Sequence, residues 1–287
     1  MRLDMPFNLD ATLCCGQVFS WERRKEWWYG VVGDRVLKVS QINRELEFDG
    51  NVNTVFLKRY FSLDHDLQQI SCKINKDTHV QAALKKFWGL RIVRQEPWEC
   101  LISFICATYK SVAAIKHMLH NLSVKFGKKL VFEGCDFFSF PRPEKLAGAT
   151  LGDLGDCGLG YRAKYVLETS KRINASKFDL EALKNMPYEQ AKVELCQFPG
   201  VGLKVADCIL LFSLEKLEAF PIDVWIKRIM LKYYFRHFSV GFVKDLRMEK
   251  SLSNAEYEIL SRFGREYFGD YAGYAQEYLY HYERMNG

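Results

Sequence analysis

The sequence predicts an α+β protein with a small antiparallel sheet domain at residues 1–97 and a helical domain at residues 98–287. The first fifty residues contain short β-branched or aromatic runs, separated by turn signals such as Asp49-Gly50. From Thr54 onward, apolar residues recur every three or four positions, as they do along one face of a helix. A chain of 287 residues also exceeds the usual single-domain size of about 100–150 residues.

Each element follows from a local pattern. The sheet is expected to be a meander of four strands, at residues 17–21, 27–32, 36–41 and 46–48. Pro97 favours the start of a long apolar helix, since proline is well tolerated in the first helical turn, and it marks the expected domain boundary. Further helices are expected at residues 110–126, 143–157, 161–175, 178–186, 188–197, 203–215, 223–235, 253–267 and 270–284.

Composition excludes several classes of protein. A content of 48% hydrophobic and 26% charged residues argues against a disordered chain. The longest apolar windows, at residues 100–109 and 205–214, are half as long as the roughly 20 residues that span a bilayer. The first residues lack the pattern of a signal peptide, so we expect a cytoplasmic or nuclear protein without a membrane partner.

The cysteines are expected to be reduced thiols. There are nine, an odd number, at irregular spacings and without a C-x-x-C pair. This spacing argues against a zinc site or an iron–sulfur cluster, and we expect no cofactor. The formal net charge of +6 favours a polyanionic partner, although it is mild.

A glycine hairpin is the most informative motif. In the stretch FPGVGLK at residues 198–204, one helix should end before Pro199 and another should open after Gly202. Backbone N–H groups of Gly200, Val201 and Gly202 would then face an anion such as a DNA phosphate, without reading bases. The alternative is an ordinary hairpin between two helices.

Two residues near this hairpin point to an enzyme. Lys204 lies in the first turn of the second helix, where the helix dipole and partial burial are expected to lower its pKa and favour the nucleophilic amine. It could instead be one more phosphate contact. Asp223 precedes another expected helix and could stabilise positive charge on a sugar as its base departs, or serve simply as an N-cap.

The order of these motifs resembles the helix-hairpin-helix DNA glycosylases with a Gly/Pro-rich loop and Asp, and more narrowly the 8-oxoguanine DNA glycosylase/AP lyases. The resemblance extends over nearly the whole chain, through the stretches LCCGQVFSW at 13–21, RQEPWEC at 94–100, FIC at 104–106, GLGYRAKY at 158–165, KVADC at 204–208 and GYAQEYLY at 273–280. Related endonuclease III and adenine glycosylases carry a four-cysteine cluster, whereas this chain has no cysteine after Cys208.

The resemblance implies a role for each catalytic and pocket residue. Lys204 would attack the sugar C1′ and form a Schiff base, with Asp223 stabilising the charged sugar. Recognition of the flipped base would fall to a second set. The carbonyl of Gly16 would accept from the N7–H of 8-oxoguanine. The thiol of Cys208 and the ring of Tyr280 would stack on the faces of the base, and the amide of Gln276 would bind its Watson–Crick edge. Pro221 would also line the pocket.

The resemblance also implies a set of DNA contacts. Tyr161 would wedge into the duplex, Arg162 would face the estranged cytosine, and Tyr109 would fill the gap left by the flipped base. Trp225 stands where several relatives have histidine. The fold often holds a structural cation as well, here on the backbone carbonyls of Cys196, Phe198 and Val201.

Two departures from the family pattern matter for specificity. The second arginine that some relatives use to read cytosine is absent, with Ala113 and Ala114 in that stretch. Phenylalanine is commoner than tyrosine at position 280.

We therefore expect a bifunctional enzyme, active as a monomer on duplex DNA that contains 8-oxoguanine. One alternative keeps the superfamily but changes the substrate to another damaged purine, such as an alkylated one; the lysine argues against it. The other is a noncatalytic DNA-binding protein, which would need neither the Lys204–Asp223 pair nor a pocket lined from both ends of the chain.

Overall fold

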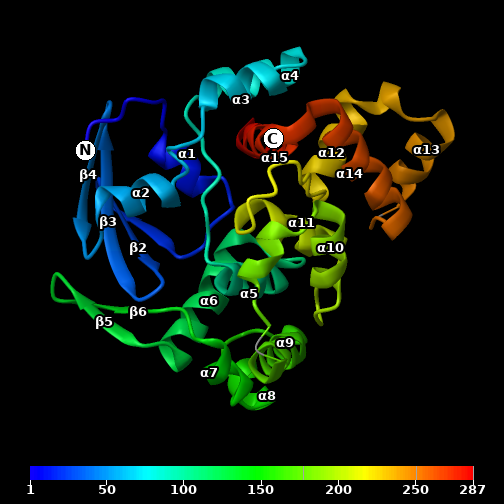
Figure 1. Cartoon of the computed structure of the whole chain (residues 1–287). Helices are drawn as coiled ribbons and strands as arrows, with labels where there is room; N and C mark the ends of the chain where they lie inside the picture. Colours follow the sequence, from blue (N-terminus) through cyan, green and yellow to red (C-terminus); the bar gives the residue numbers. More distant parts are fainter. Residues whose placement is uncertain (177, 250, 287) are drawn as a thin grey trace.

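The computed structural model describes residues 1–176, 178–249 and 251–286. Its N-terminal part holds a four-stranded antiparallel meander, in the order β1 (Trp21–Arg24), β2 (Trp27–Val32), β3 (Arg35–Ile42) and β4 (Glu45–Gly50) (Figure 1). Many helices follow, so the expected α+β class is confirmed.

The prediction of a first strand at residues 17–21 is wrong except at its last residue, Trp21. Residues 17–20 are irregular, and β1 begins at Trp21. The reason is the turn at Gly16, whose φ is +97°, and the neighbouring Gln17, whose side chain pairs with backbone outside the sheet.

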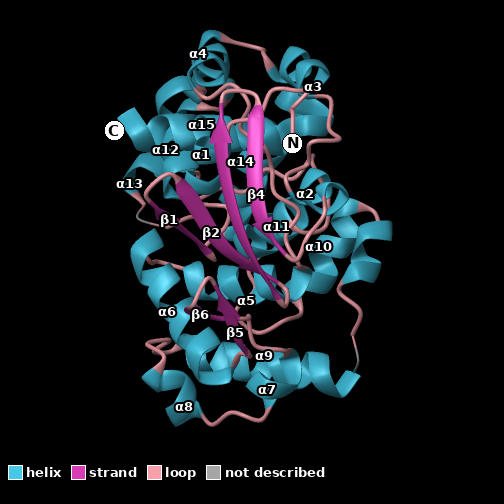
Figure 2. Cartoon of the chain, turned by 90° about the vertical axis from the view of Figure 1, so that its left-hand side faces the viewer, coloured by secondary structure: helices cyan, strands magenta, loops and turns pink. Residues whose placement is uncertain are grey.

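The N-terminal sheet lies at one side of the molecule, and the helices form the bulk beside it (Figures 1 and 2). The first group is α1 (Leu9–Cys14), α2 (Thr54–Tyr60), α3 (Leu67–Ile74) and α4 (Thr78–Lys86). The second group is α5 (Pro97–Ala107), α6 (Val112–Phe126), α7 (Pro143–Ala147), α8 (Leu151–Asp156), α9 (Arg162–Ser176), α10 (Tyr188–Cys196), α11 (Leu203–Phe212), α12 (Val224–Tyr233), α13 (Val240–Met248), α14 (Asn254–Phe268) and α15 (Ala272–Asn286). Short 3₁₀ turns lie at η1 (Glu181–Asn185), η2 (Phe235–His237) and η3 (Gly269–Tyr271).

Several expected helices need correction. The helix expected at 143–157 is two helices, because the chain turns at Gly148, the C-cap of α7, and restarts at a capping box formed by Thr150 and Asp153. The helix expected at 178–186 is the shorter 3₁₀ turn η1, and α11 ends at Phe212 rather than residue 215. Helix α13 was not expected.

A second small sheet was also missed. Strands β5 (Lys129–Phe132) and β6 (Cys135–Phe138) form a hairpin that reaches toward the N-terminal sheet (Figure 1). Lys38 Nζ lies 2.6 Å from Glu133 at the hairpin tip, and the rings of Tyr29 and Phe137 stack. The hairpin therefore joins the two parts of the chain.

The larger core is shared between the N-terminal and helical segments. It contains Ala11, Cys15 and Phe19 together with buried residues of the helices from α3 to α15. A smaller core lies under the sheet, around Trp21 and Leu37. The loop after α1 is consequently packed into the helical part of the molecule. No helix in the described residues is both long and apolar enough to cross a bilayer.

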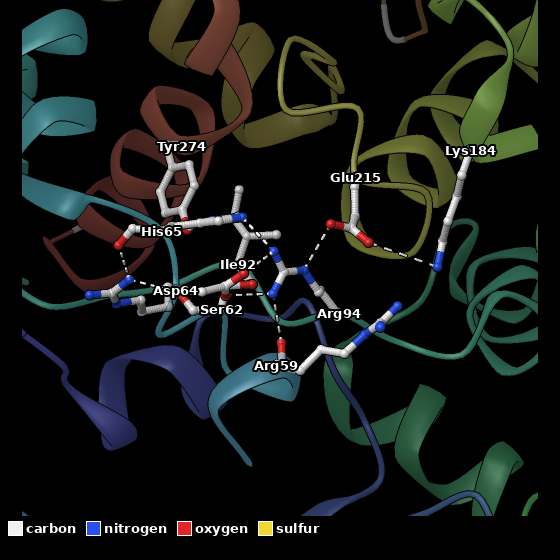
Figure 3. A network of polar contacts seen from close by, with 10 residues as sticks. Arg59, Ser62, Asp64, His65, Ile92, Arg94, Lys184, Glu215 and Tyr274 are labelled. Atoms are coloured by element: carbon white, nitrogen blue, oxygen red, sulfur yellow. Dashed lines mark hydrogen bonds and ion pairs between the residues drawn. The ribbon is translucent and has the colours of Figure 1, made fainter. Parts of the chain in front are cut away.

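A polar network around Arg94 links distant segments (Figure 3). The Arg94 guanidinium pairs with Asp64 at 2.6 Å and with Glu215, after α11, at 2.9 Å. It also donates to Nε2 of His65, while Nδ1 of His65 lies 2.9 Å from the hydroxyl of Tyr274 on α15. Burial and the positive charge of Arg94 lower the pKa of His65 to about 4, so its ring is neutral and can accept from the arginine while donating to the tyrosine. The network thus anchors α15.

Candidate active site

The glycine hairpin joins α10 to α11, as expected. Gly200 has a φ of +83°, and a Cβ at this position would lie 2.9 Å from the side chain of Tyr165. Gly202 is the N-cap of α11 with no side-chain cap, and a Cβ there would meet nothing within 4 Å. The first N–H groups of α11 therefore open onto space that a phosphate can approach.

Lys204 is half-buried at the start of α11. Its Nζ lies 5.0 Å from the centroid of the Phe104 ring. Cys208 is buried one turn further along the same helix, and burial raises the pKa of its thiol to about 12, opposed by the nearby charge of Lys204. Cys208 is therefore a neutral thiol beside the amine.

Asp223 caps α12 and lies close enough to Lys204 to feel its charge. Its Oδ1 accepts from the backbone N–H groups of Trp225 at 3.0 Å and Ile226 at 2.8 Å. Burial raises the pKa of Asp223, whereas these two donors and the positive charge of Lys204 oppose the rise. The same carboxyl of Asp223 therefore serves as the N-cap of α12 and lies near the amine of Lys204.

Gly16 brings the N-terminal loop against the C-terminal helix. A Cβ on Gly16 would lie 3.0 Å from Nη1 of Arg284 and 3.3 Å from the hydroxyl of Tyr280, both on α15. Burial raises the pKa of the Tyr280 hydroxyl, and the charge of Asp223 adds to the rise. Gly16 and Tyr280 therefore lie beside the guanidinium of Arg284, in the region of Asp223 and Lys204.

Two further pocket residues lie in the same region. Gln276 is buried one turn before Tyr280, and its Oε1 has no hydrogen-bond partner. Pro221 is buried two residues before Asp223. The amide oxygen of Gln276 is therefore a buried acceptor that no group of the described chain uses.

The expected DNA contacts form a separate set. Tyr109 is 81% exposed and Tyr161 is 59% exposed, so both rings are free to meet a duplex. Arg162 is instead buried, with its guanidinium 4.4 Å from the Tyr161 ring centroid and bonded to the carbonyl of Thr108. Trp225 is half-buried beneath the guanidinium of Arg228.

The expected cation site consists of backbone carbonyls. The Val201 N–H donates to the Phe198 carbonyl at 3.1 Å, which closes the hairpin. Within the described ranges, no cluster of three acidic, histidine or cysteine side chains could hold a metal ion. A cation held by the carbonyls of Cys196, Phe198 and Val201 stays a prediction.

Comparison with known proteins identifies the family. Residues 3–101 match the N-terminal domain of 8-oxoguanine DNA glycosylase, and residues 102–239 match the HhH-GPD superfamily of base excision DNA repair proteins. The N-glycosylase/DNA lyase of Saccharomyces cerevisiae is 32% identical over 278 residues, which cover 88% of this chain and 73% of the yeast protein. This chain belongs to the 8-oxoguanine DNA glycosylase family.

Two other members of the family are also similar. The probable N-glycosylase/DNA lyase of Methanothermobacter thermautotrophicus is 33% identical over 247 residues, covering 79% of this chain and 73% of that protein. The 8-oxoguanine glycosylase/lyase of Clostridium acetobutylicum, solved with duplex DNA containing cytosine opposite 8-oxoguanine, superposes with a TM-score of 0.86 at 34% identity. That match covers 98% of this chain and 93% of the clostridial one.

The structure adds Asp207 to the residues that shape this glycosylase site. Asp207 is fully buried on α11, and it accepts from the hydroxyls of Tyr188 at 2.5 Å and Tyr257 at 2.6 Å, with Lys192 at 3.4 Å. It follows Lys204 by three residues, so its bonds fix the helix that carries the amine. The sequence signal was a single acid within the apolar window at residues 205–214.

Substitution of the hairpin glycines Gly200 and Gly202 by alanine should have different effects on stability. Gly200→Ala should lower the free energy of unfolding by about 1–3 kcal/mol, because its positive φ and the Tyr165 ring both oppose a side chain. Gly202→Ala should keep wild-type stability, since its backbone conformation and surroundings accept a Cβ. Urea denaturation of the two variants measures the difference, and equal losses would contradict the hairpin geometry.

Proposed function

We propose that this protein excises 8-oxoguanine from duplex DNA and then cleaves the abasic strand by β-elimination. The observation that carries the proposal is the nearness of the Lys204 amine to the Asp223 carboxyl, in the region where Gly16 meets Tyr280 of α15. A noncatalytic DNA-binding protein would need neither the pair nor this meeting of the two ends of the chain.

The proposed chemistry uses one nucleophile and one carboxylate. The neutral amine of Lys204 forms a bond to the sugar C1′ while the N-glycosidic bond breaks and its electron pair leaves with the base. Asp223 stabilises the positive charge that develops on the sugar. Loss of a proton and opening of the sugar ring give a Schiff base. Removal of a C2′ proton then expels the 3′ phosphate.

The proposed base pocket distinguishes 8-oxoguanine from guanine by one donor. The carbonyl of Gly16 accepts from N7–H, which guanine lacks, so guanine would present a lone pair to that oxygen. The free Oε1 of Gln276 faces no other partner in the described structure and suits the donors of the Watson–Crick edge. Cys208, as a neutral thiol, and the Tyr280 ring would contact opposite faces of the base.

The proposed partner is duplex DNA, bound by a protein monomer. The open start of α11 supplies phosphate contacts, and the exposed rings of Tyr109 and Tyr161 supply surfaces for unstacked bases. In this proposal, Arg162 leaves the Thr108 carbonyl to reach the opposing base. The DNA-bound structure of the clostridial relative supports this class of partner.

Replacement of the nucleophile should abolish the covalent intermediate. Borohydride should trap wild-type protein on an 8-oxoguanine duplex, and Lys204→Gln should give no adduct while still binding the duplex. Lys244→Gln, which changes an exposed lysine of α13, is the matched control and should trap like wild type. Gel analysis after reduction measures the adduct, and full trapping by the Lys204 variant would exclude Lys204 as the nucleophile.

Neutralising the carboxylate should slow excision without unfolding the protein. Asp223→Asn keeps an amide oxygen for the N-cap bonds, so thermal stability should be retained. Loss of the charge should reduce the single-turnover rate by about 100- to 1000-fold, since one preorganised charge contributes about 2.7–4 kcal/mol to the barrier. A rate within twofold of wild type would leave Asp223 with the capping role alone.

Selectivity for the opposing base should be modest. Arg162 is the one arginine that we assign to cytosine, and Ala113 and Ala114 offer no second donor. Each buried polar group left unpaired by a wrong base costs about 1–3 kcal/mol, so the missing donor should relax discrimination by about one to two powers of ten. Single-turnover excision from four duplexes that differ only at this base measures the preference. A preference for cytosine above about a thousandfold would contradict this interpretation.

A further inference from the structure

The buried carboxylate of Asp207 on α11 is contacted from two other helices. Tyr188 and Lys192 belong to α10, whereas Tyr257 and Ser261 belong to α14. In each helix the two residues are four positions apart and therefore share one face, from which both reach the carboxylate. All five residues are buried, so water cannot replace a contact that is lost. Asp207 thus fixes α11 against two separate parts of the molecule.

The contacts from α10 join the two helices that flank the glycine hairpin. The Tyr188 hydroxyl donates to Oδ1 of Asp207 at 2.5 Å. Lys192 Nζ donates to the Tyr188 hydroxyl at 3.3 Å and lies 3.4 Å from Oδ2 of Asp207. Because α10 leads into the hairpin at residues 197–202 and α11 follows it, these contacts fix the two helices between which the hairpin is held. The N–H groups of this hairpin are the ones that we assign to a DNA phosphate.

The contacts from α14 reach the backbone just before α12. The Tyr257 hydroxyl donates to Oδ2 of Asp207 at 2.6 Å and accepts from the Ile222 N–H at 3.3 Å. The Ser261 hydroxyl donates to the carbonyl of Phe220 at 3.1 Å and lies 3.4 Å from the same oxygen of Asp207. These two side chains therefore tie α11, which carries the proposed nucleophile, to the short segment that ends at the proposed catalytic carboxyl.

We propose that the two sets of contacts to Asp207 have separate functions. The contacts from α10 hold the glycine hairpin in the shape that binds the DNA backbone, and the contacts from α14 set the position of Asp223 relative to Lys204. The inference rests on the proposed excision of 8-oxoguanine. The residues of α10 and α14 that make these contacts are positioning residues, since they are buried and act through the backbone segments that they hold.

The two functions should affect different kinetic constants. A displacement of about 1 Å between reacting groups can lower a rate by about a hundredfold, even when the mutated residue is remote from the chemistry. Loss of an α14 contact should therefore lower the rate of the chemical step. Contacts to phosphate fix a protein on the duplex without reading bases, so loss of an α10 contact should weaken DNA binding. Helix α11 is common to both sets, and each set holds it when the other is weakened.

Two tyrosine-to-phenylalanine variants separate these functions. Tyr257→Phe and Tyr188→Phe each keep the ring and remove one hydroxyl that donates to the same carboxylate. Single-turnover excision, measured against enzyme concentration, gives the maximal rate and the half-saturation concentration. Tyr257→Phe should lower the maximal rate by about 10- to 100-fold and change the half-saturation concentration by less than about threefold. Tyr188→Phe should raise the half-saturation concentration by about tenfold, or about 1.4 kcal/mol, and change the maximal rate by less than about threefold.

Binding of undamaged duplex is a second measurement, and it requires no excision. The hairpin N–H groups would contact phosphate whatever the bases are. Fluorescence anisotropy with undamaged duplex should therefore show about a tenfold higher Kd for Tyr188→Phe and the wild-type Kd for Tyr257→Phe. Absence of excision by wild type would overturn the proposed function and the role of the α14 contacts, whereas the Kd values would still decide the role of the α10 contacts.

Tyr234 provides a matched control. It is buried, and its hydroxyl donates to a carboxylate, Oδ2 of Asp77, at 2.9 Å. It lies at the C-terminal end of α12, whereas Asp223 lies at the N-terminal end. Tyr234→Phe should lower the Tm, as the other two variants do, because a hydrogen bond to a charged group is lost. Its maximal rate, half-saturation concentration and Kd for undamaged duplex should all stay within about threefold of wild type.

A general structural role of Asp207 predicts a different result. Both tyrosine variants would then lose stability and would change the same constants to the same extent, or neither constant would change. Either result, with wild type active, would overturn the separation of functions and leave the excision activity standing. If a phenylalanine variant does not fold, Ser261→Ala repeats the comparison for α14 and Lys192→Met repeats it for α10. Ser261→Ala must lower only the maximal rate, and Lys192→Met must weaken only DNA binding.

Discussion

The pocket depends on one buried amide, the side chain of Gln17. Its Oε1 accepts from the Val93 N–H at 2.7 Å, and its Nε2 donates to the carbonyls of Thr12 at 3.0 Å and Arg91 at 2.8 Å. These partners are backbone groups, so the loop that carries Gly16 is fixed against the extended segment before α5. The Arg94 network secures the same segment to α15 (Figure 3). Gly16 near one end of the chain is therefore held against Tyr280 and Arg284 near the other.

Buried polar groups of the scaffold and of the pocket differ in their hydrogen bonding. Arg91 is fully buried and donates to the carbonyls of Pro6, Ser62 and His65. In the part of the chain that the structure describes, four buried side-chain atoms lack a partner, and two of them are on the adjacent residues Gln276 and Glu277. Each such atom costs about 1–3 kcal/mol, a cost that a ligand with matching donors can remove. Two of the four unpaired atoms therefore lie on the segment of α15 that includes Gln276, where a base is expected to bind.

Much of the fold, and the helix starts at which Lys204 and Asp223 stand, could be predicted because they depend on local signals. The β-branched and aromatic runs of β2 and β3, the glycine hairpin and the N-cap at Asp223 are all visible within a few residues. The irregular residues 17–20 were mistaken for a strand because the partners of Gln17 lie more than seventy positions away.

The proposed site combines a preorganised base pocket with DNA-facing residues, among which Arg162 must change its contacts when DNA binds. The loop that carries Gly16 is held by the bonds of Gln17 to the backbone. Tyr109, in contrast, is exposed and adopts a φ of +54°, a conformation that non-glycine residues seldom adopt. Arg162 is buried against Tyr161 and bonded to Thr108. In the proposed function it must break that bond whichever base stands opposite, so the cost is common to all four duplexes. In this proposal, discrimination at the opposing base then rests on the new contacts of one arginine, whereas recognition of the lesion rests on residues drawn from both ends of the chain.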